Sequence, residues 1–226
     1  MNKNIELLSL RSFASSNTDR YVVRKSPLTR VLDVFLVLLA CPSFILLILV
    51  IAILIMLESK GGVFYSQIRI GKGGRKFKAY KFRTMVQNAD HSLQNYLDKS
   101  PELKAEWLAN HKLKRDPRVT WVGAFLRKFS LDELPQLWNI FIGDMSLIGP
   151  RPIVDEEIEK YGERFELYKM VRPGLTGLWQ VSGRSDTCYE RRVELDEYYL
   201  LNWSFKLDIQ ILLRTVLVVL RKDGAY

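Results

Sequence analysis

Two adjacent carboxylates, Asp132 and Glu133, are the residues whose types and spacing first suggest chemistry. They lie in the string Leu126-Arg-Lys-Phe-Ser-Leu-Asp-Glu-Leu-Pro-Gln136, and Arg127 stands five residues before Asp132. An ionised aspartate is the group that nucleophilic attack on phosphorus or ligation of Mg²⁺ needs. A helix N-terminus would hold such a carboxylate in its ionised form through the helix dipole. The pair therefore points to phosphate or metal chemistry.

The same pair also fits a purely structural role. Ser130-Leu-Asp-Glu133 matches a capping box, in which Ser130 caps a helix and Glu133 reaches back to the backbone of Ser130. Pro135 fits the first turn of a helix that continues through Asn139. On the residues alone the capping role is the favoured interpretation, although a capping carboxylate can also belong to a site.

Isolated arginines and conformationally special residues follow the pair. Arg151 stands between two prolines in the string from Gly143 to Pro152, and a third dense string runs from Gly174 to Arg184. The planar fork of arginine donates two parallel hydrogen bonds, which suits a phosphate. Glycine and proline fix unusual backbone paths, as a close approach to a ligand requires. A single arginine, taken alone, is more often half of a surface ion pair.

The composition narrows the classes of protein. The chain has 226 residues, with 34 Lys and Arg against 25 Asp and Glu and a formal net charge of +9. This length predicts one main domain with an appendage, and 48% hydrophobic residues exclude a disordered chain. Two cysteines, Cys41 and Cys188, and two histidines argue against a disulfide scaffold and a structural zinc site. A basic chain suggests an anionic partner: nucleic acid, an acidic membrane surface or phosphorylated substrates.

An apolar run from Val31 to Leu57 is long enough to cross a bilayer. Apart from Asp33 and Ser43 it carries no polar side chain, and at about 1.5 Å per residue a straight helix of this length reaches roughly 40 Å. On length alone a spanning helix is the favoured interpretation. Arg30 lies three residues before Asp33, so we expect the two to pair where the chain enters the membrane.

Pro42 and the flanking charges favour a different topology. Pro42 removes a backbone hydrogen bond, and the Ser43 hydroxyl could satisfy a freed backbone group. Residues 1–30 carry a net charge of +4 and residues 58–85 a net charge of +7. A spanning helix would place one basic flank outside, against the positive-inside tendency. We therefore expect a re-entrant helix, broken at Cys41-Pro42, that enters and leaves by the cytoplasmic face.

The remainder of the chain predicts a β-hairpin and several helices. Strands are expected at 63–70 and 76–83, joined by a glycine-rich turn at 71–74. Seven Lys or Arg and no acid stand between Arg69 and Arg83, which suits lipid headgroups or a phosphate-binding edge. Helices are expected at 86–115, 161–170, 189–203 and 207–220, of which the last is too short to span and could be core or lie on the bilayer.

Together these motifs resemble the monotopic phosphoglycosyl transferases of bacteria, also called bacterial sugar transferases or polyprenyl-phosphate sugar-1-phosphate transferases. The resemblance covers nearly the whole chain after about Arg24, and the chain looks like the minimal catalytic form, without the extra transmembrane helices of larger members. It is carried, in order, by Arg30-Val-Leu-Asp33 before a proline-broken apolar helix, Tyr80-Lys-Phe-Arg-Thr-Met85, Leu126 to Gln136, Gly143 to Pro152, and Gly174 to Arg184.

The resemblance and the flank charges together imply a fold and a location. The expected fold is mostly α with a small β-hairpin or sheet. We expect a polar segment at 1–25, a re-entrant membrane hairpin at 26–58 and a cytoplasmic α+β catalytic domain with interfacial amphipathic helices at 59–226. The expected location is the bacterial inner membrane, with the catalytic domain facing the cytoplasm.

The resemblance also implies a reaction. Members move sugar-1-phosphate from a UDP-hexose or UDP-N-acetylhexosamine to undecaprenyl phosphate and release UMP, the first membrane step of surface polysaccharide or glycoconjugate synthesis. Asp132 would attack and form a covalent phospho-sugar intermediate in a ping-pong mechanism, Glu133 would complete the dyad, and both would bind Mg²⁺. The residues implied in phosphate or substrate binding are Arg127, Arg151, Lys81, Arg83, Gln180 and Arg184.

Two other functions stay open at this point. A membrane-anchored basic scaffold that binds an anionic polymer would use the hairpin charges, but it would have no need of the dyad or of Pro-Arg-Pro. A direct glycosyltransferase would release UDP instead of UMP. Nucleic acid is the least expected of the anionic partners, because much of the positive charge flanks the apolar run. A homodimer is possible.

Overall fold

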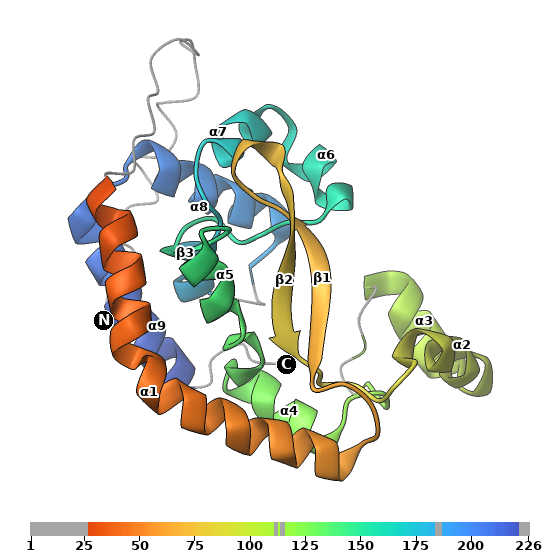
Figure 1. Ribbon diagram of the computed structural model, residues 1–226. Helices are drawn as coiled ribbons and strands as arrows, with labels where there is room; N and C mark the ends of the chain where they lie inside the picture. Colours follow the sequence, from red (N-terminus) through yellow and green to blue (C-terminus); the bar gives the residue numbers. More distant parts are fainter. Residues whose placement is uncertain (1–26, 111–112, 114–115, 184–186, 222–226) are drawn as a thin grey trace.

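The computed structural model describes residues 27–110, 113, 116–183 and 187–221 (Figure 1). A long apolar helix, α1 (Pro27–Glu58), borders a domain of short helices that contains two small sheets. The prediction of a mostly helical protein with a small sheet is therefore confirmed.

Helix α1 is continuous but bent along its length (Figure 1). The predicted break at Cys41-Pro42 is wrong, because Pro42 and Ser43 both lie inside the helix. Proline lacks one hydrogen-bond donor, which can bend a helix without ending it. By length and composition α1 could cross a membrane. Four of its residues are buried, namely Asp33, Val37, Ile51 and Ile55.

The N-terminal half of α1 is bonded to the domain. Arg30 donates hydrogen bonds to two carbonyl oxygens at the C-terminal end of α5 (Gln136–Ile142). The buried Asp33 carboxylate accepts from Ser146 Oγ at 2.7 Å and from the Leu147 N–H at 3.1 Å. Arg30 and Asp33, which were predicted to pair, thus bond to α5 and to β3 (Ser146–Ile148), respectively.

The C-terminal end of α1 is bonded to the same domain. The Glu58 carboxylate accepts from the N–H groups of Trp121 and Val122, the first two residues of α4 (Trp121–Lys128). Thr120 caps this helix through a bond from the Gly123 N–H to its hydroxyl. A carboxylate at a helix N-terminus is favoured by the unpaired N–H groups and the dipole. Both ends of α1 are thus held against one folded unit.

The predicted hairpin is confirmed. Strand β1 (Phe64–Ile70) pairs antiparallel with β2 (Lys76–Phe82), and a 3₁₀ turn at Lys72–Gly74 joins them. A second, parallel pair joins β3 to β4 (Gly174–Thr176). A Cβ on Gly174 would lie 2.1 Å from the Gly149 backbone nitrogen, so this crossing needs glycine. Two of the dense strings in the sequence therefore meet as neighbouring strands.

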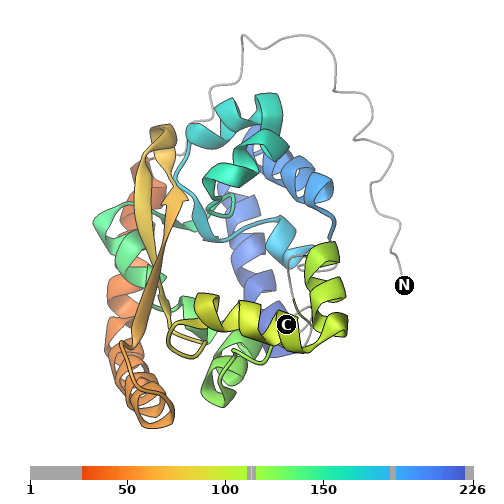
Figure 2. The same cartoon turned by 90° about the vertical axis from the view of Figure 1, so that its right-hand side faces the viewer.

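Short helices complete the domain. The helix expected at 86–115 divides into α2 (Ala89–Lys99) and α3 (Pro101–Asn110), which project beyond the hairpin in Figure 1 and face the viewer in Figure 2. The helix expected at 161–170 is instead two short helices, α6 (Ile158–Tyr161) and α7 (Phe165–Lys169), with a 3₁₀ turn between them. Each division falls where proline or glycine interrupts the helical hydrogen bonds.

The helices predicted at 189–203 and 207–220 are both present. They are α8 (Tyr189–Leu201) and α9 (Phe205–Arg221). The Asp208 carboxylate joins them, because it accepts from Tyr199 OH at 2.7 Å and from Trp203 Nε1 at 2.9 Å. Under the parallel strand pair, both helices contribute to a core made of Ile148, Val171, Leu178, Tyr199, Leu200 and Ile211.

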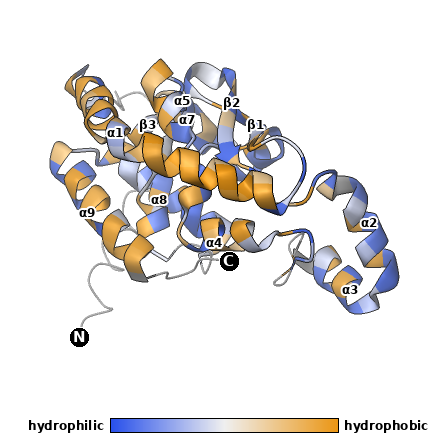
Figure 3. Ribbon diagram, turned by 60° about the horizontal axis from the view of Figure 1, so that its bottom comes forward, coloured by the Kyte–Doolittle hydropathy of each residue, from blue (hydrophilic) through white to orange (hydrophobic). Residues whose placement is uncertain are grey.

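Large apolar side chains are exposed on several helices besides α1. Figure 3 shows hydrophobic colour along α1, α4 and α9, whereas hydrophilic colour is prominent on α2. The exposed side chains include Trp121 and Phe125 on α4, and Leu213, Val216, Leu217 and Leu220 on α9. Large exposed apolar patches typically mark a contact with a membrane or another protein.

A buried carboxyl on α8 makes the stability depend on pH. Asp196 is 1% exposed, and its Oδ2 accepts from Tyr161 OH at 2.7 Å. Burial raises the pKa of Asp196 to about 8, against the opposing effects of the Tyr161 hydrogen bond and the Arg151 charge. The folded protein therefore binds a proton here that the unfolded chain, with a pKa of about 4, releases at neutral pH.

We expect the stabilisation from protonated Asp196 to be complete below about pH 4 and to be lost as the pH rises toward about 8. In the variant Asp196→Asn this loss should disappear, so its melting temperature in detergent should change less between pH 5 and 8 than that of the wild type. The control is Asp155→Asn, whose carboxylate is half exposed and pairs with Lys76. Identical pH slopes for Asp196→Asn and the wild type would contradict this assignment.

Candidate functional site

The two adjacent carboxylates lie in a 3₁₀ turn, Leu131–Glu133, between α4 and α5. The predicted capping box is wrong: Ser130 has a left-handed backbone (φ 56°) and makes no side-chain capping bond. The Glu133 side chain turns instead toward Lys81 and Arg151. Bonds from cations to a carboxylate are stronger than a bond from a neutral backbone N–H, so the cations prevail.

Glu133 is bonded to two cations. Its Oε1 lies 2.7 Å from Lys81 Nζ and 3.0 Å from Arg151 Nη2, and its side chain is 16% exposed. Burial alone would raise the pKa of Glu133, but the charges and hydrogen bonds of Arg151 and Lys81 outweigh it and lower the pKa to about 2. Glu133 is therefore ionised at neutral pH.

Asp132 titrates in the opposite direction. Burial and the neighbouring Glu133 carboxylate raise its pKa, while the charges of Lys81, Arg127 and Arg151 oppose the rise. Lys81 Nζ lies 3.8 Å from Asp132 Oδ2. Asp132 lies in a three-residue turn and not at the N-terminus of a longer helix, so burial and the neighbouring charges, more than a helix dipole, set its pKa. Asp132 is therefore the more basic carboxylate of the pair.

Arg127, on α4, approaches the pair from the side of Asp132. Its Nε donates to Thr84 Oγ1 at 2.9 Å. Burial lowers the pKa of Arg127, while the charges of Asp132 and Asp116 raise it. The dyad therefore has Arg127 on the Asp132 side and Arg151 on the Glu133 side.

Asn139 fixes the geometry between α5 and the hairpin. It is fully buried, its Oδ1 accepts from the Tyr80 N–H at 3.1 Å, and its Nδ2 donates to the Lys78 carbonyl at 2.7 Å. These two bonds join α5 side-on to β2, just before Lys81. Because Glu133 stands three residues before the start of α5, they also set Lys81 opposite Glu133.

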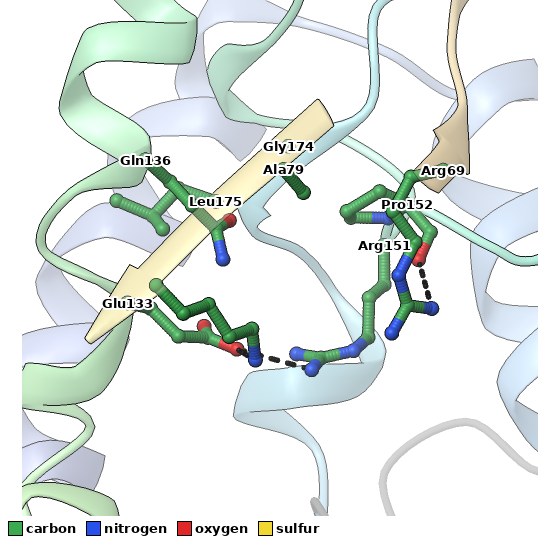
Figure 4. A pocket seen from close by; sticks show the side chains of 9 residues that line it. Arg69, Ala79, Glu133, Gln136, Arg151, Pro152, Gly174 and Leu175 are labelled. Carbon is green, nitrogen blue, oxygen red and sulfur yellow. Dashed lines mark hydrogen bonds and ion pairs between the residues drawn. The ribbon is translucent and has the colours of Figure 1, made fainter. Parts of the chain in front are cut away.

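A small pocket lies beside Glu133 (Figure 4). Glu133, Lys81 and Arg151 line it, together with Arg69 from β1 and Gln136 from α5. Reasoning from the sequence did not single out Arg69 and Gln136 as site residues. The uninterrupted basic run of the hairpin, and the place of Gln136 one helical turn after Glu133, are the signals that could have identified them.

Two other predicted residues, Arg83 and Gln180, are placed differently. Arg83 donates to the carbonyls of Ser59 and Lys60, just after α1, rather than to the dyad. The Gln180 amide donates to the Leu175 carbonyl at 3.2 Å, next to the pocket-lining strand β4. Arg184 lies outside the described residues.

Asp132 and Glu133 could supply two of the ligands of a magnesium ion. Two crowded carboxylates, one with a raised pKa, form an arrangement that a divalent cation would stabilise. Among the described residues no cluster of three or more potential ligand side chains exists. Mg²⁺ commonly uses one or two carboxylates and takes its remaining ligands from substrate phosphates and water. Asp132 and Glu133 therefore suit a metal that arrives with a phosphorylated substrate.

The chain has known relatives. The model of the bacterial sugar transferase family matches residues 24–222. The UDP-galactose-lipid carrier transferase of Erwinia amylovora and the undecaprenyl-phosphate galactose phosphotransferase of Salmonella typhimurium are each 44% identical over 222 residues, which is 98% of this chain and 45% of each relative. The exopolysaccharide production protein ExoY of Sinorhizobium fredii is 46% identical over 197 residues, 87% of either chain.

These matches include every string from which the site is built. The chain spans less than half the length of the first two curated relatives and most of the length of the third. The dyad, Lys81, Arg127 and Arg151 all lie inside the region that the family model matches. The chain therefore belongs to the bacterial sugar transferase family.

Proposed function

We propose that the protein transfers sugar-1-phosphate from a UDP-sugar to undecaprenyl phosphate and releases UMP, at an early step of surface polysaccharide or glycoconjugate synthesis. The observation that carries this proposal is Asp132, a carboxylate of raised pKa flanked by Lys81, Arg127 and Arg151. Three cations against two carboxylates leave the site positive, which suits a pyrophosphate. The names of the relatives supply the UDP-sugar and the lipid acceptor.

The reaction we propose has two displacements at one phosphorus. An Asp132 oxygen attacks the sugar-bearing phosphate, an aspartyl–phosphorus bond forms, and the bond to the UMP oxygen breaks. An oxygen of the lipid phosphate then attacks the same phosphorus, and the carboxylate of Asp132 leaves. Lys81, Arg127 and Arg151 stabilise the charge on the transferred group and on UMP. Mg²⁺ held by Asp132 and Glu133 would neutralise further negative charge.

The nucleophile is tested by Asp132→Asn. This variant should insert into membranes normally but lose UMP release by several orders of magnitude, because the amide cannot form the acyl phosphate. Glu133→Gln should also be strongly impaired, since it leaves Lys81 and Arg151 without their carboxylate. The control is Lys76→Met, which removes an exposed charge from β2, the strand that also carries Lys81. The assay uses a panel of UDP-sugars with undecaprenyl phosphate and Mg²⁺.

Three results would overturn the assignment. Normal UMP release by Asp132→Asn would exclude it as the nucleophile. Release of UDP instead of UMP would favour a direct glycosyltransferase. Salt-sensitive binding to an anionic polymer, with no UMP released from any UDP-sugar, would favour the basic scaffold.

The pH dependence tests the environment of Asp132. The attacking carboxylate must be ionised, so the rate should fall on the acid side of the pH profile. Lys81→Met removes a charge that lowers the pKa of Asp132, so the midpoint of this fall should move to higher pH at a fixed Mg²⁺ concentration. Lys76→Met should leave the midpoint unchanged, and an unshifted profile in Lys81→Met would contradict the proposed coupling.

We also propose that α1 is re-entrant and that the domain lies at the cytoplasmic leaflet of the bacterial inner membrane. Support comes from the bonds at both ends of α1: Asp33 joins it to β3 and Glu58 joins it to α4. A straight helix across the bilayer would separate these two points by the membrane thickness, about 30 Å of hydrocarbon. The exposed apolar side chains of α4 and α9 would rest on the same leaflet. The homodimer stays a prediction.

Cysteine labelling tests this topology. In a background with both natural cysteines replaced, Ser16→Cys reports on the segment before α1, and Lys72→Cys reports on the exposed hairpin turn. A membrane-impermeant thiol reagent should label neither position in intact cells and both after lysis. Labelling of Ser16→Cys alone in intact cells would indicate a spanning helix.

A further inference from the structure

Arg69, on β1, places a second guanidinium beside that of Arg151 (Figure 4). Its Nη1 donates to the Pro152 carbonyl at 3.1 Å, and its Nη2 donates to Gln67 Oε1 at 2.6 Å. Its side chain is 16% exposed, and Glu157 Oε2 lies 3.7 Å from Nη1. Arg69 is therefore held at the pocket wall by its own partners and does not bond to the dyad.

The charge at this wall is incompletely balanced. Burial lowers the pKa of Arg69, and the charge of Arg151 lowers it further, which shows that the two cations repel each other. Arg151 shares Glu133 with Lys81, and the carboxylate nearest Arg69 lies beyond hydrogen-bond distance. Two adjacent guanidiniums of this kind form a favourable place for an anion with several oxygens, because each planar fork can donate to it.

The arginines lie at two opposite ends of the site. Arg127 stands on the Asp132 side, whereas Arg151 and then Arg69 stand on the Glu133 side. The reaction proposed above involves more than one phosphate, and only the attacked phosphate lies at Asp132. Resting on that proposed function, we propose that Arg69 and Arg151 together form a second phosphate subsite, at the end of the site opposite Arg127.

Two phosphates could occupy this subsite: the nucleotide-side phosphate of the UDP-sugar, or the phosphate of the lipid acceptor. Both present the same chemistry to a pair of guanidiniums. They enter different half-reactions of a two-displacement mechanism, so the value of kcat/KM for each substrate reports on its own half-reaction. Separate measurement of the two values therefore identifies the occupant.

The test compares Arg69→Met and Arg69→Lys with the control Arg75→Met, which removes one exposed charge from the same hairpin. Arg69→Met should lower kcat/KM for one substrate by about 10- to 100-fold, the usual effect of losing a charged hydrogen bond, and leave the other nearly unchanged. Arg69→Lys should recover part of the loss. A selective loss for the UDP-sugar assigns the nucleotide phosphate, and a selective loss for undecaprenyl phosphate assigns the lipid phosphate.

A structural role for Arg69 predicts a different pattern. Loss of the bond to Pro152 alone would lower the melting temperature or reduce both kcat/KM values equally, and either result without substrate selectivity would overturn the subsite. Failure of the proposed function is distinguishable, because the wild type would then release no UMP from any UDP-sugar. In that case the stabilisation of the wild type by inorganic pyrophosphate, and its loss in Arg69→Met, would still report on the anion site by thermal shift.

Discussion

Asp132 and Glu133 are neighbours in the chain and both are largely buried, so their mutual repulsion and loss of hydration must be offset by cations. Lys81 and Arg151 supply those charges from elements that are distant in sequence, β2 and the loop after β3. The two cations stabilise the two carboxylates unequally. Glu133 accepts hydrogen bonds from both Lys81 and Arg151, which lower its pKa, while the pKa of Asp132 stays raised. The two adjacent carboxylates therefore have pKa shifts of opposite direction.

The long apolar helix α1 belongs to the same arrangement. Asp33 binds the start of β3, whose chain continues to Arg151, and Glu58 binds the start of α4, which carries Arg127. Two carboxylates of an otherwise apolar helix thus hold the two segments that carry the arginines of the site. The carboxylates of Asp33 and Glu58 join α1 to these segments by charge-assisted hydrogen bonds. A shift of α1 would therefore be transmitted directly to the segments that carry Arg127 and Arg151.

Much of the fold was readable from local patterns. The hairpin followed from alternation and a glycine-rich turn, and α8 and α9 followed from helical periodicity. The predictions that failed depended on competition between local and distant partners. Glu133 binds Lys81 and Arg151 instead of the Ser130 backbone, and the proline in α1 lies within a continuous helix that it does not break.

By itself the sequence determined the residue types of the site, the apolar helix with basic flanks and the family, because these depend on composition and on strings of adjacent residues. Only the tertiary structure decided which carboxylate has the raised pKa, since that depends on cations 52 residues before Glu133 and 18 residues after it. It also decided that Arg69 joins Arg151 at one pocket wall, because strand pairing and the Pro152 carbonyl, not sequence spacing, bring the two guanidiniums together.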